Sequence, residues 1–477
     1  MLFLTPRTGP LTQAVLDQGE LLRQLVDGLG SPVGVVLPQA VHANVAAFRE
    51  VYRRHHLSGR IHFAHKANRS SALLRELAAT EAGVDVASLG ELQHALGAGF
   101  TPGRIMATGP KDHAYLWLAA RTGVTVNADS AAELEELAAL VTAHRLPRVR
   151  VMVRLSGFET TGVRVMSRRS RFGVPAATLD SALDVVRKRE QQLELTGVAY
   201  HLDTVAVAEK AVALEGCLAA LEHCRSLGLR PWTLDAGGGF GIGYLADEGE
   251  WERYTSELAQ AVLGNRPPLT WNGYGYGLRA ESGILRGSLA LYPAYREVSG
   301  AAYLDRLLGA DAPERRRPLG TMLLDHMYDL DVEPGRALLD QCGLVVARVV
   351  EVRDDGGDVL VRLAMNARDV SLEEHGVLMD PVLIGRTPHE PAGVYLLGNL
   401  CLESDLITRR KVFLPARPQV GDLLAFVNAA GYFMDLTANT ALHQPLARKV
   451  AVFRAGGSWH WSLDEQYWPI HPPPEPP

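Results

Sequence analysis

The feature that most constrains the fold of this chain is an alternation of short apolar, β-branched segments with helix-like segments. The helix-like segments include 131–143 and 213–226. This alternation favours parallel βαβ units, and about eight such units favour a (β/α)8 barrel. The expected strands are 61–65, 84–87, 104–107, 124–127, 149–154, 197–201, 232–235 and, as the eighth, 328–332.

The pattern changes after Arg336, where the segments 343–353, 359–364 and 422–427 are typical of strands with little helix between them. We therefore expect an α/β chain: a TIM barrel followed by a β-rich domain, either a β-barrel or a sandwich. A strand at 32–37 would bring the N-terminal segment into that second domain. The predicted parts are 1–37 (N-terminal segment), 38–336 (barrel, with an insertion at about 245–327), 337–470 (β-rich domain) and 471–477 (proline-rich tail).

Composition indicates a soluble, cytoplasmic enzyme. The 477 residues are 47% hydrophobic and 21% charged, with a formal net charge of −6. This balance gives no reason to expect nucleic acid or a membrane as partner, and no apolar run is long enough for a membrane span. The four cysteines lack metal-ligand spacing, so we expect no metal site. The expected partners are a small-molecule substrate and further copies of this chain.

Lys66 is the first candidate for chemistry. It ends the expected strand 61–65, and an alanine- and leucine-rich helix follows at 70–80. A lysine at the mouth of a barrel strand can act as a nucleophile and hold a carbonyl cofactor as a Schiff base, most commonly pyridoxal phosphate (PLP). The alternative is a strand-end lysine that reaches water.

Other polar residues follow the ends of the expected strands, which meet at one rim of a barrel. The run Gly237, Gly238 and Gly239 is either an anion-binding loop or a plain turn. In Glu-Pro-Gly-Arg (333–336), the glutamate is suited to pair with a pyridine nitrogen and the arginine to bind a phosphate. The alternative is that this segment is a surface turn. The remaining rim residues are Asp85, Arg154 and His201, the last being either a group against a cofactor ring or a core histidine.

Eight ordered motifs carry a resemblance that covers about residues 32–440. The chain resembles the fold-type III PLP-dependent decarboxylases, the group of diaminopimelate, ornithine/arginine and carboxynorspermidine decarboxylases, with alanine racemase as a distant relative. The motifs are His-Lys-Ala-Asn (65–68), Val-Asp-Val-Ala-Ser (84–88), Ala-Thr-Gly-Pro-Lys (107–111), Ala-Asp-Ser (128–130), Tyr-His-Leu-Asp-Thr (200–204), Asp-Ala-Gly-Gly-Gly-Phe-Gly (235–241), Glu-Pro-Gly-Arg (333–336) and Cys-Leu-Glu-Ser-Asp (401–405).

The resemblance implies a role for each matching residue. Lys66 would hold PLP as a Schiff base, His201 would stack on the ring, and Glu333 would pair with the pyridine nitrogen. It also implies a homodimer with shared sites, in which Cys401 of the partner subunit is the proton donor. The other implied cofactor contacts are Asp85, Arg154, Thr204, Gly237, Gly238, Gly239, Gly335, Arg336 and Tyr432, and the implied substrate contacts are Glu403 and Asp405.

The sequence departs from the family pattern in three places, and the last two, at position 402 and in the insertion, suggest a larger substrate conjugate. Asp203 and Thr204 stand where the family usually has Gly-Ser, and Leu402 replaces an acidic residue, with Glu403 one position later. The stretch from the glycine run to Glu333 is about twice the usual length. Its aromatic and basic residues either line the pocket or decorate the outside; they include Trp271, Tyr274, Tyr276 and Arg279.

The expected activity is α-decarboxylation of a basic or diamino acid, or of a larger amino-acid conjugate, with Lys66, His201 and Cys401 as catalytic residues. The sequence leaves two alternative functions open. A PLP-dependent racemase or epimerase shares the barrel and the lysine, and a non-catalytic relative would regulate a partner by binding.

Overall fold

The computed structural model describes residues 1–158 and 170–469, so the expected tail at 471–477 lies outside the described residues. The chain divides into two compact units. One consists of Val41–Gly241 and Val298–Leu338. The other consists of Met1–Ala40, Ile242–Glu297 and the residues from Leu339 onward.

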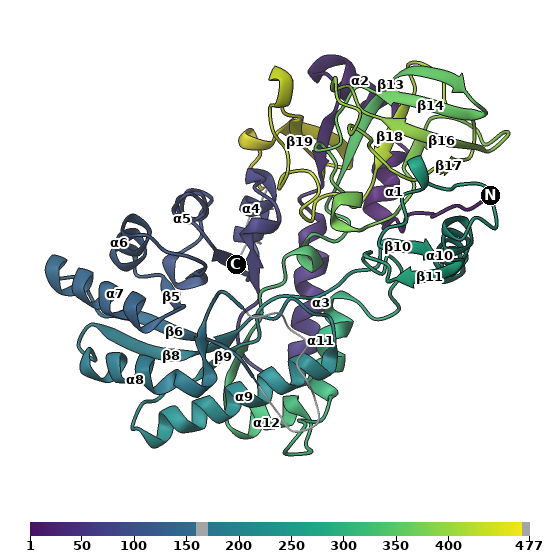
Figure 1. The fold of residues 1–477 in the computed structure, drawn as a ribbon. Helices are drawn as coiled ribbons and strands as arrows, with labels where there is room; N and C mark the ends of the chain where they lie inside the picture. Colours follow the sequence, from purple (N-terminus) through teal and green to yellow (C-terminus); the bar gives the residue numbers. More distant parts are fainter. Residues whose placement is uncertain (159–169, 470–477) are drawn as a thin grey trace. The chain divides into compact units, whose positions relative to one another are not determined.

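The first unit is a closed parallel barrel (Figure 1). Among the described residues, eight strands follow one another in the order β2-β3-β4-β5-β6-β8-β9-β12, and a parallel bridge between Ile61 and Val332 joins the last strand to the first. Met106, Met152 and Ala199 form a buried cluster in its core. The strands are β2 His62–Ala64, β3 Gly83–Val86, β4 Ile105–Ala107, β5 Thr125–Ala128, β6 Val149–Ser156, β8 Leu193–Tyr200, β9 Thr233–Asp235 and β12 Asp329–Asp331; the short β7 Val174–Pro175 pairs with β6.

Helices alternate with the barrel strands along the chain. Four of these helices begin at an N-cap residue whose side chain accepts a hydrogen bond from a backbone N–H in the first turn. The N-cap residues are Ser70, Ser88, Asp112 and Ser130. The helices are α3 Ala40–Arg54, α4 Ser71–Ala78, α5 Leu89–Gly97, α6 His113–Thr122, α7 Ala131–His144, α8 Leu179–Lys188, α9 Val207–Ser226, α11 Gly300–Gly309 and α12 Leu319–Asp325.

The fold-class prediction is confirmed, and the eight expected strands occur in order. The largest difference concerns β8, which begins at Leu193 rather than at 197. Leu193 and Leu195 are buried, whereas Glu194 between them is only half-buried. This alternation extends the strand beyond the continuous apolar run that was visible in the sequence.

The second unit is built on a sheet that contains nine strands of the described chain. Strand β1 lies between β13 and β19, which brings the N-terminal segment into the β-rich unit as expected. The strands are β1 Val33–Val36, β13 Gly343–Asp355, β14 Asp358–Leu363, β15 Val382–Ile384, β16 Ala392–Leu397, β17 Val412–Leu414, β18 Leu423–Phe426, β19 Arg448–Ala455 and β20 Ser458–Leu463. The helices of this unit are α1 Pro10–Leu16, α2 Gly19–Leu29 and α10 Glu248–Val262.

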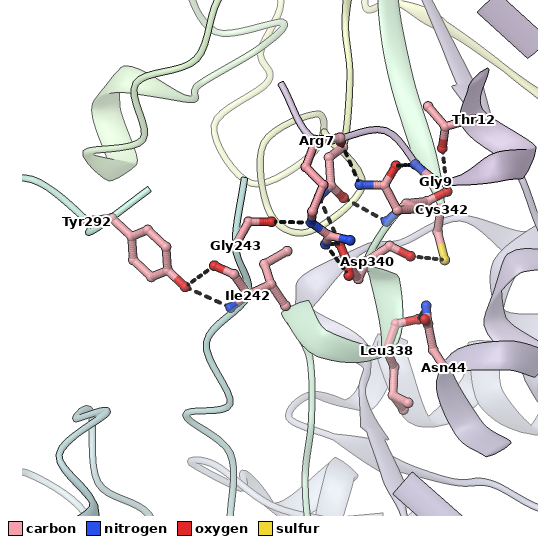
Figure 2. Close-up of polar contacts among 12 residues, drawn as sticks. Arg7, Gly9, Thr12, Asn44, Ile242, Gly243, Tyr292, Leu338, Asp340 and Cys342 are labelled. Atoms are coloured by element: carbon pink, nitrogen blue, oxygen red, sulfur yellow. Dashed lines mark hydrogen bonds and ion pairs between the residues drawn. The ribbon is translucent and has the colours of Figure 1, made fainter. Parts of the chain in front are cut away.

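The N-terminal residues are held to the start of β13 by polar contacts (Figure 2). Arg7 Nη2 donates to Asp340 Oδ1 at 2.7 Å, and Arg7 Nε donates to the Gly243 carbonyl at 3.0 Å. The N–H of Gly9 donates to Gln341 Oε1 at 2.8 Å. One guanidinium therefore connects three segments that are far apart in the sequence.

The segment 242–297, expected within the barrel domain, belongs instead to the β-rich unit. The Trp271 ring packs edge-on against Tyr395 of β16 with centroids 5.3 Å apart, and Tyr276 Oη donates to Glu373 Oε2 at 2.9 Å. Its β10 Leu278–Glu281 and β11 Ile284–Gly287 form a separate hairpin. Aromatic residues of the insertion thus pack on the β-rich unit, which sequence periodicity alone did not reveal.

Arg410 forms the centre of a buried charge cluster in this unit. Its side chain is fully buried, Nη1 donates to Asp380 Oδ1 at 2.7 Å, and Nε lies 3.6 Å from Glu373 Oε1. Burial raises the pKa of both carboxyls, and the Arg410 charge opposes that rise. The cluster includes the insertion through the hydrogen bond of Tyr276 to Glu373.

We expect Arg410→Met to lower the free energy of unfolding by about 3–5 kcal/mol, because it leaves two buried carboxylates without their cation. Urea denaturation at neutral pH measures this loss. The neighbouring Arg409 is exposed, so Arg409→Met is the matched control, with an expected cost under about 1 kcal/mol. Equal losses in both variants would contradict the role assigned to the cluster.

Candidate functional site

The rim of the barrel carries most of the predicted site residues. Lys66 lies in the 3-10 turn His65–Ala67 directly after β2, Arg154 lies in β6, and His201 follows β8. All three line a cavity of about 1210 Å³. Its wall also includes Thr108, Gly109, Ser156, Arg171, Phe172, Asp203, Thr204 and Glu209.

The side chain of Lys66 is exposed, whereas His65 and Ala67 on either side are buried. Its surroundings are charged rather than apolar, since its positive charge acts on Asp85, Glu91 and Glu333. The Lys66 side chain therefore lines the cavity and has carboxylates among its neighbours.

His201 and Glu333 form a pair at the rim. His201 Nδ1 lies 3.7 Å from Glu333 Oε2, and the Glu333 side chain is only 8% exposed. Burial by itself would raise the pKa of the Glu333 carboxyl, but the nearby His201 and the charges of Lys66 and Arg154 lower it below its usual value. Burial lowers the pKa of His201. Glu333 is thus an ionised carboxylate at neutral pH.

The glycine run follows β9 and packs against the His201 segment. A Cβ on Gly237, which has φ 62°, would lie 2.3 Å from the Tyr200 carbonyl oxygen, so glycine is required there. Gly237 N–H donates to Asp235 Oδ1 at 2.7 Å, and Gly238 N–H donates to His201 Nδ1 at 3.3 Å. Gly237 therefore shapes the loop, and its N–H, an implied cofactor contact, is engaged by the Asp235 side chain.

Asp85 is buried in β3 beside Lys66. Its Oδ1 accepts a hydrogen bond from Thr108 Oγ1 at 2.6 Å. Burial raises the pKa of Asp85 to about 7, and the charge of Glu333 adds to the rise, whereas Lys66 opposes it. Asp85 is therefore poised to change its protonation state near neutral pH.

We expect Asp85→Asn to stabilise the apoenzyme at pH 8 by about 1–3 kcal/mol more than at pH 4. The folded-state pKa exceeds the unfolded value of 3.8, so the contribution of Asp85 to stability is complete below pH 4 and is lost as the pH rises to 7. Urea denaturation at several pH values measures the difference, with the exposed Asp184→Asn as control. A gain independent of pH would contradict this assignment.

The remaining predicted residues fall into two groups. Gly335 and Arg336 follow Glu333 in the barrel unit, where Arg336 begins the 3-10 turn Arg336–Leu339. Cys401, Glu403, Asp405 and Tyr432 belong to the β-rich unit, so the rim of the barrel is formed without them. Tyr432 is half-buried and has φ 77°, and both Cys401 and Glu403 are exposed.

The Asp405 carboxylate is used by its own loop. Oδ1 accepts from the Ala367 N–H and Oδ2 from the Leu400 N–H, each at 2.8 Å, and the side chain is buried. This arrangement differs from the substrate contact expected of Asp405. It makes Asp405 a positioning residue for the loop that presents Cys401.

Three further residues support the site: Thr108 and Asp129 lie in the quoted motifs but were given no role, and Lys210 lies outside all of these motifs. Thr108 binds Asp85, and Asp129 Oδ1 lies 3.7 Å from Arg154 Nη1. Lys210 is a fully buried lysine of α9 whose Nζ donates to the Gly238 carbonyl. An isolated lysine within the apolar stretch of α9 was the available sequence signal for this last residue.

The rim has groups that fit PLP. The exposed Lys66 amine faces the cavity, and the ionised Glu333 is buried beside His201. The insertion residues Trp271, Tyr274, Tyr276 and Arg279 are absent from the described cavity wall. Within the described ranges, no group of His, Cys, Asp and Glu is arranged to hold a metal ion, and no helix has the length and apolar character to cross a membrane.

Comparisons with known proteins agree with this geometry. Residues 39–283 match the family described as pyridoxal-dependent decarboxylase, pyridoxal binding domain. The uncharacterized protein y4yA of Sinorhizobium fredii is 30% identical, with 91% of this chain and 90% of that protein covered. A diaminopimelate decarboxylase of Actinosynnema pretiosum is 27% identical, with 89% and 86% covered.

Solved structures show the same fold. Diaminopimelate decarboxylase of M. jannaschii, in complex with L-lysine, has a TM-score of 0.69 at 17% identity, with 92% of this chain and 90% of that chain covered. The arginine decarboxylase of Paramecium bursaria Chlorella virus has a TM-score of 0.66 at 17% identity, with 92% and 100% covered. The chain belongs to the pyridoxal-dependent amino-acid decarboxylases, whose cofactor is pyridoxal 5'-phosphate.

Proposed function

We propose that this enzyme removes the α-carboxylate of a basic or diamino acid, or of a larger conjugate of one, with Lys66 as the Schiff-base lysine. The observation that carries the proposal is the position of Lys66. Of the six lysines in the chain, it alone lines the cavity at the rim of the barrel.

The bound cofactor supplies the electron sink that makes loss of carbon dioxide feasible. The residues of the protein would orient the cofactor and hold a proton on its pyridine nitrogen. His201 would lie against the ring, and the Glu333 carboxylate would hold a proton on the pyridine nitrogen. The residues that would hold the phosphate are Gly238, Gly239, Thr204, Arg336 and Tyr432, whereas Asp85 and Arg154 would contact the cofactor near Lys66 and Gly335 would shape the turn.

The second proton transfer is assigned to Cys401 of the partner subunit, whose Sγ protonates the α-carbon after carbon dioxide leaves. The exposure of Cys401 on a loop held by Asp405 supports this assignment. The functional unit would then be a homodimer with shared sites, in which Glu403 is the candidate substrate contact from the same loop.

Two carboxylates on the cavity wall offer partners for a cationic substrate side chain, beside the basic Lys66, Arg154 and Arg171. Asp203 and Glu209 both line the cavity, although the acidic residue usual at position 402 is replaced by leucine. Two carboxylates on the wall favour a distal ammonium or guanidinium group. In this proposal, the carboxylates that would bind the cationic group of the substrate are therefore Asp203 and Glu209 of the barrel unit.

The test is to incubate the holoenzyme with a panel of amino acids and to record carbon dioxide release and product mass. The panel contains diaminopimelate, ornithine, lysine, arginine, Nε-acylated and N-carboxyalkyl conjugates, and neutral and acidic amino acids. We expect turnover of cationic substrates or their conjugates. Release of carbon dioxide from neutral or acidic amino acids alone would refute the substrate class.

A further inference from the structure

Lys210 is a buried cation that the proposed reaction does not use. It lies in the first turns of α9 with 0% of its surface exposed, and its neighbours Ala211, Val212, Ala213 and Leu214 are also buried. Burying an ammonium group is costly unless it is paired. Its presence in this apolar helix therefore requires an explanation.

The protein supplies hydrogen-bonding and ring contacts to this ammonium but no adjacent counter-charge. Nζ donates to the Gly238 carbonyl and lies 4.7 Å from the ring centroid of Phe240 and 5.5 Å from that of Tyr303. In the described part of the chain, no carboxylate oxygen lies within 4 Å of it. Burial lowers the pKa of Lys210 to about 7, and the negative charge of Glu333 opposes this shift.

The ammonium lies directly against the glycine loop. A Cβ on Gly239 would come within 2.9 Å of Lys210 Nζ and 3.0 Å of the Thr204 carbonyl oxygen, so the loop, the His201 segment and α9 meet at this glycine. Among the described residues, the N–H groups of Gly239 and Phe240 donate to no protein acceptor. Two successive N–H donors next to a buried cation suit an anion.

We propose that Lys210 is a positioning residue of the phosphate loop: its ammonium fixes the Gly238 carbonyl and provides positive charge beside the Gly239 and Phe240 N–H groups. The cofactor's phosphate is the counter-charge that the protein itself does not supply. The inference rests on the proposed function in one respect, namely that the glycine loop holds the phosphate.

The rings of Phe240 and Tyr303 explain how the cation is kept in place. An aromatic face attracts an ammonium group and excludes water. Tyr303 comes from α11, which follows the insertion, whereas Phe240 directly follows the glycine run. Loop and helix thus enclose the amine between two ring faces and one carbonyl.

The test compares two ligands that differ only in the phosphate. Apoenzyme is titrated with PLP and with pyridoxal, and the two Kd values are read from absorbance at equilibrium. We expect Lys210→Met to raise the Kd for PLP about tenfold to hundredfold and the Kd for pyridoxal less than about twofold. Lys210→Arg keeps the charge and regains most of the PLP affinity. Lys188→Met, which neutralises an exposed lysine at the end of α8, serves as the matched control.

Lys210→Gln keeps a donor for Gly238 without the charge, and it replaces the methionine variant if that variant does not fold. Unchanged PLP affinity in the neutral variants, or equal losses for PLP and pyridoxal, would overturn the role of Lys210. If the wild-type enzyme itself bound PLP no better than pyridoxal, the phosphate role of the glycine loop would be wrong instead. The two failures are therefore distinguishable.

Discussion

Lys66→Ala is expected to lower kcat on the order of 10⁴-fold or more, because it removes the lysine that we propose as the nucleophile for the cofactor. Lys66 is exposed to the barrel cavity, so its removal leaves the hydrophobic core intact. The variant is expected to fold and to retain the wild-type free energy of unfolding within about 1 kcal/mol. Steady-state release of carbon dioxide measures the loss.

Covalent attachment gives a second readout that does not depend on turnover. Borohydride reduction of the holoenzyme should fix the cofactor on the peptide that contains Lys66, and mass spectrometry should find no such adduct in Lys66→Ala. Lys188→Ala is the control, since Lys188 is exposed at the end of α8. Reduction that labels another lysine in the wild-type enzyme would contradict the assignment.

Cys401→Ala is expected to lower kcat for amine formation about 10²–10³-fold, the usual contribution of a positioned general acid. Loss of carbon dioxide precedes protonation, so in a single turnover carbon dioxide release should be slowed less than amine formation. Quantifying both products in the same reaction measures the difference. Ser404→Ala, an exposed substitution in the same loop, is the control and should leave both rates within about twofold.

The same two variants test whether the sites are shared between subunits. In equal mixtures that exchange subunits, Lys66→Ala and Cys401→Ala chains should recover about a quarter of wild-type activity, because half the dimers contain one intact site. No recovery would place Cys401 in the site of its own subunit. A racemase would need Lys66 only, and a regulatory binding protein would keep its function in both variants.

The barrel was predictable because its signal is local. Each parallel strand is buried on both faces and is followed by a helix, so short apolar runs recur along the chain between helical segments. The convergence of Lys66, Arg154 and His201 on one cavity follows from the same topology, since parallel strands end at one rim.

The environments of the site residues were less predictable. The exposure of Lys66, the pKa of Asp85 near 7 and the ionised Glu333 depend on burial and on charges contributed by strands distant in sequence. The engagement of the Gly237 N–H by Asp235 likewise depends on the path of the loop. The spacing of residues along the sequence predicts neither these exposures and charges nor this hydrogen bond.

The sequence predicts even less well to which unit the segment 242–297 belongs. Its length marks it as an insertion, but tertiary contacts such as those of Tyr276 with Glu373 and of Trp271 with Tyr395 are needed to assign it to the β-rich unit. Similarly, Asp405 looks like a substrate ligand in its motif, whereas its carboxylate accepts two backbone N–H groups of its own unit.

By itself, then, the sequence determined the order of the barrel strands, the lysine after the first of them and the family motifs, because periodicity and motif spacing are properties of the chain. The tertiary structure alone decided which carboxylates are ionised, which unit receives the insertion and what surrounds Lys210. Burial and electrostatics depend on three-dimensional neighbours, such as the glycine loop that the Lys210 side chain of α9 contacts in the folded barrel.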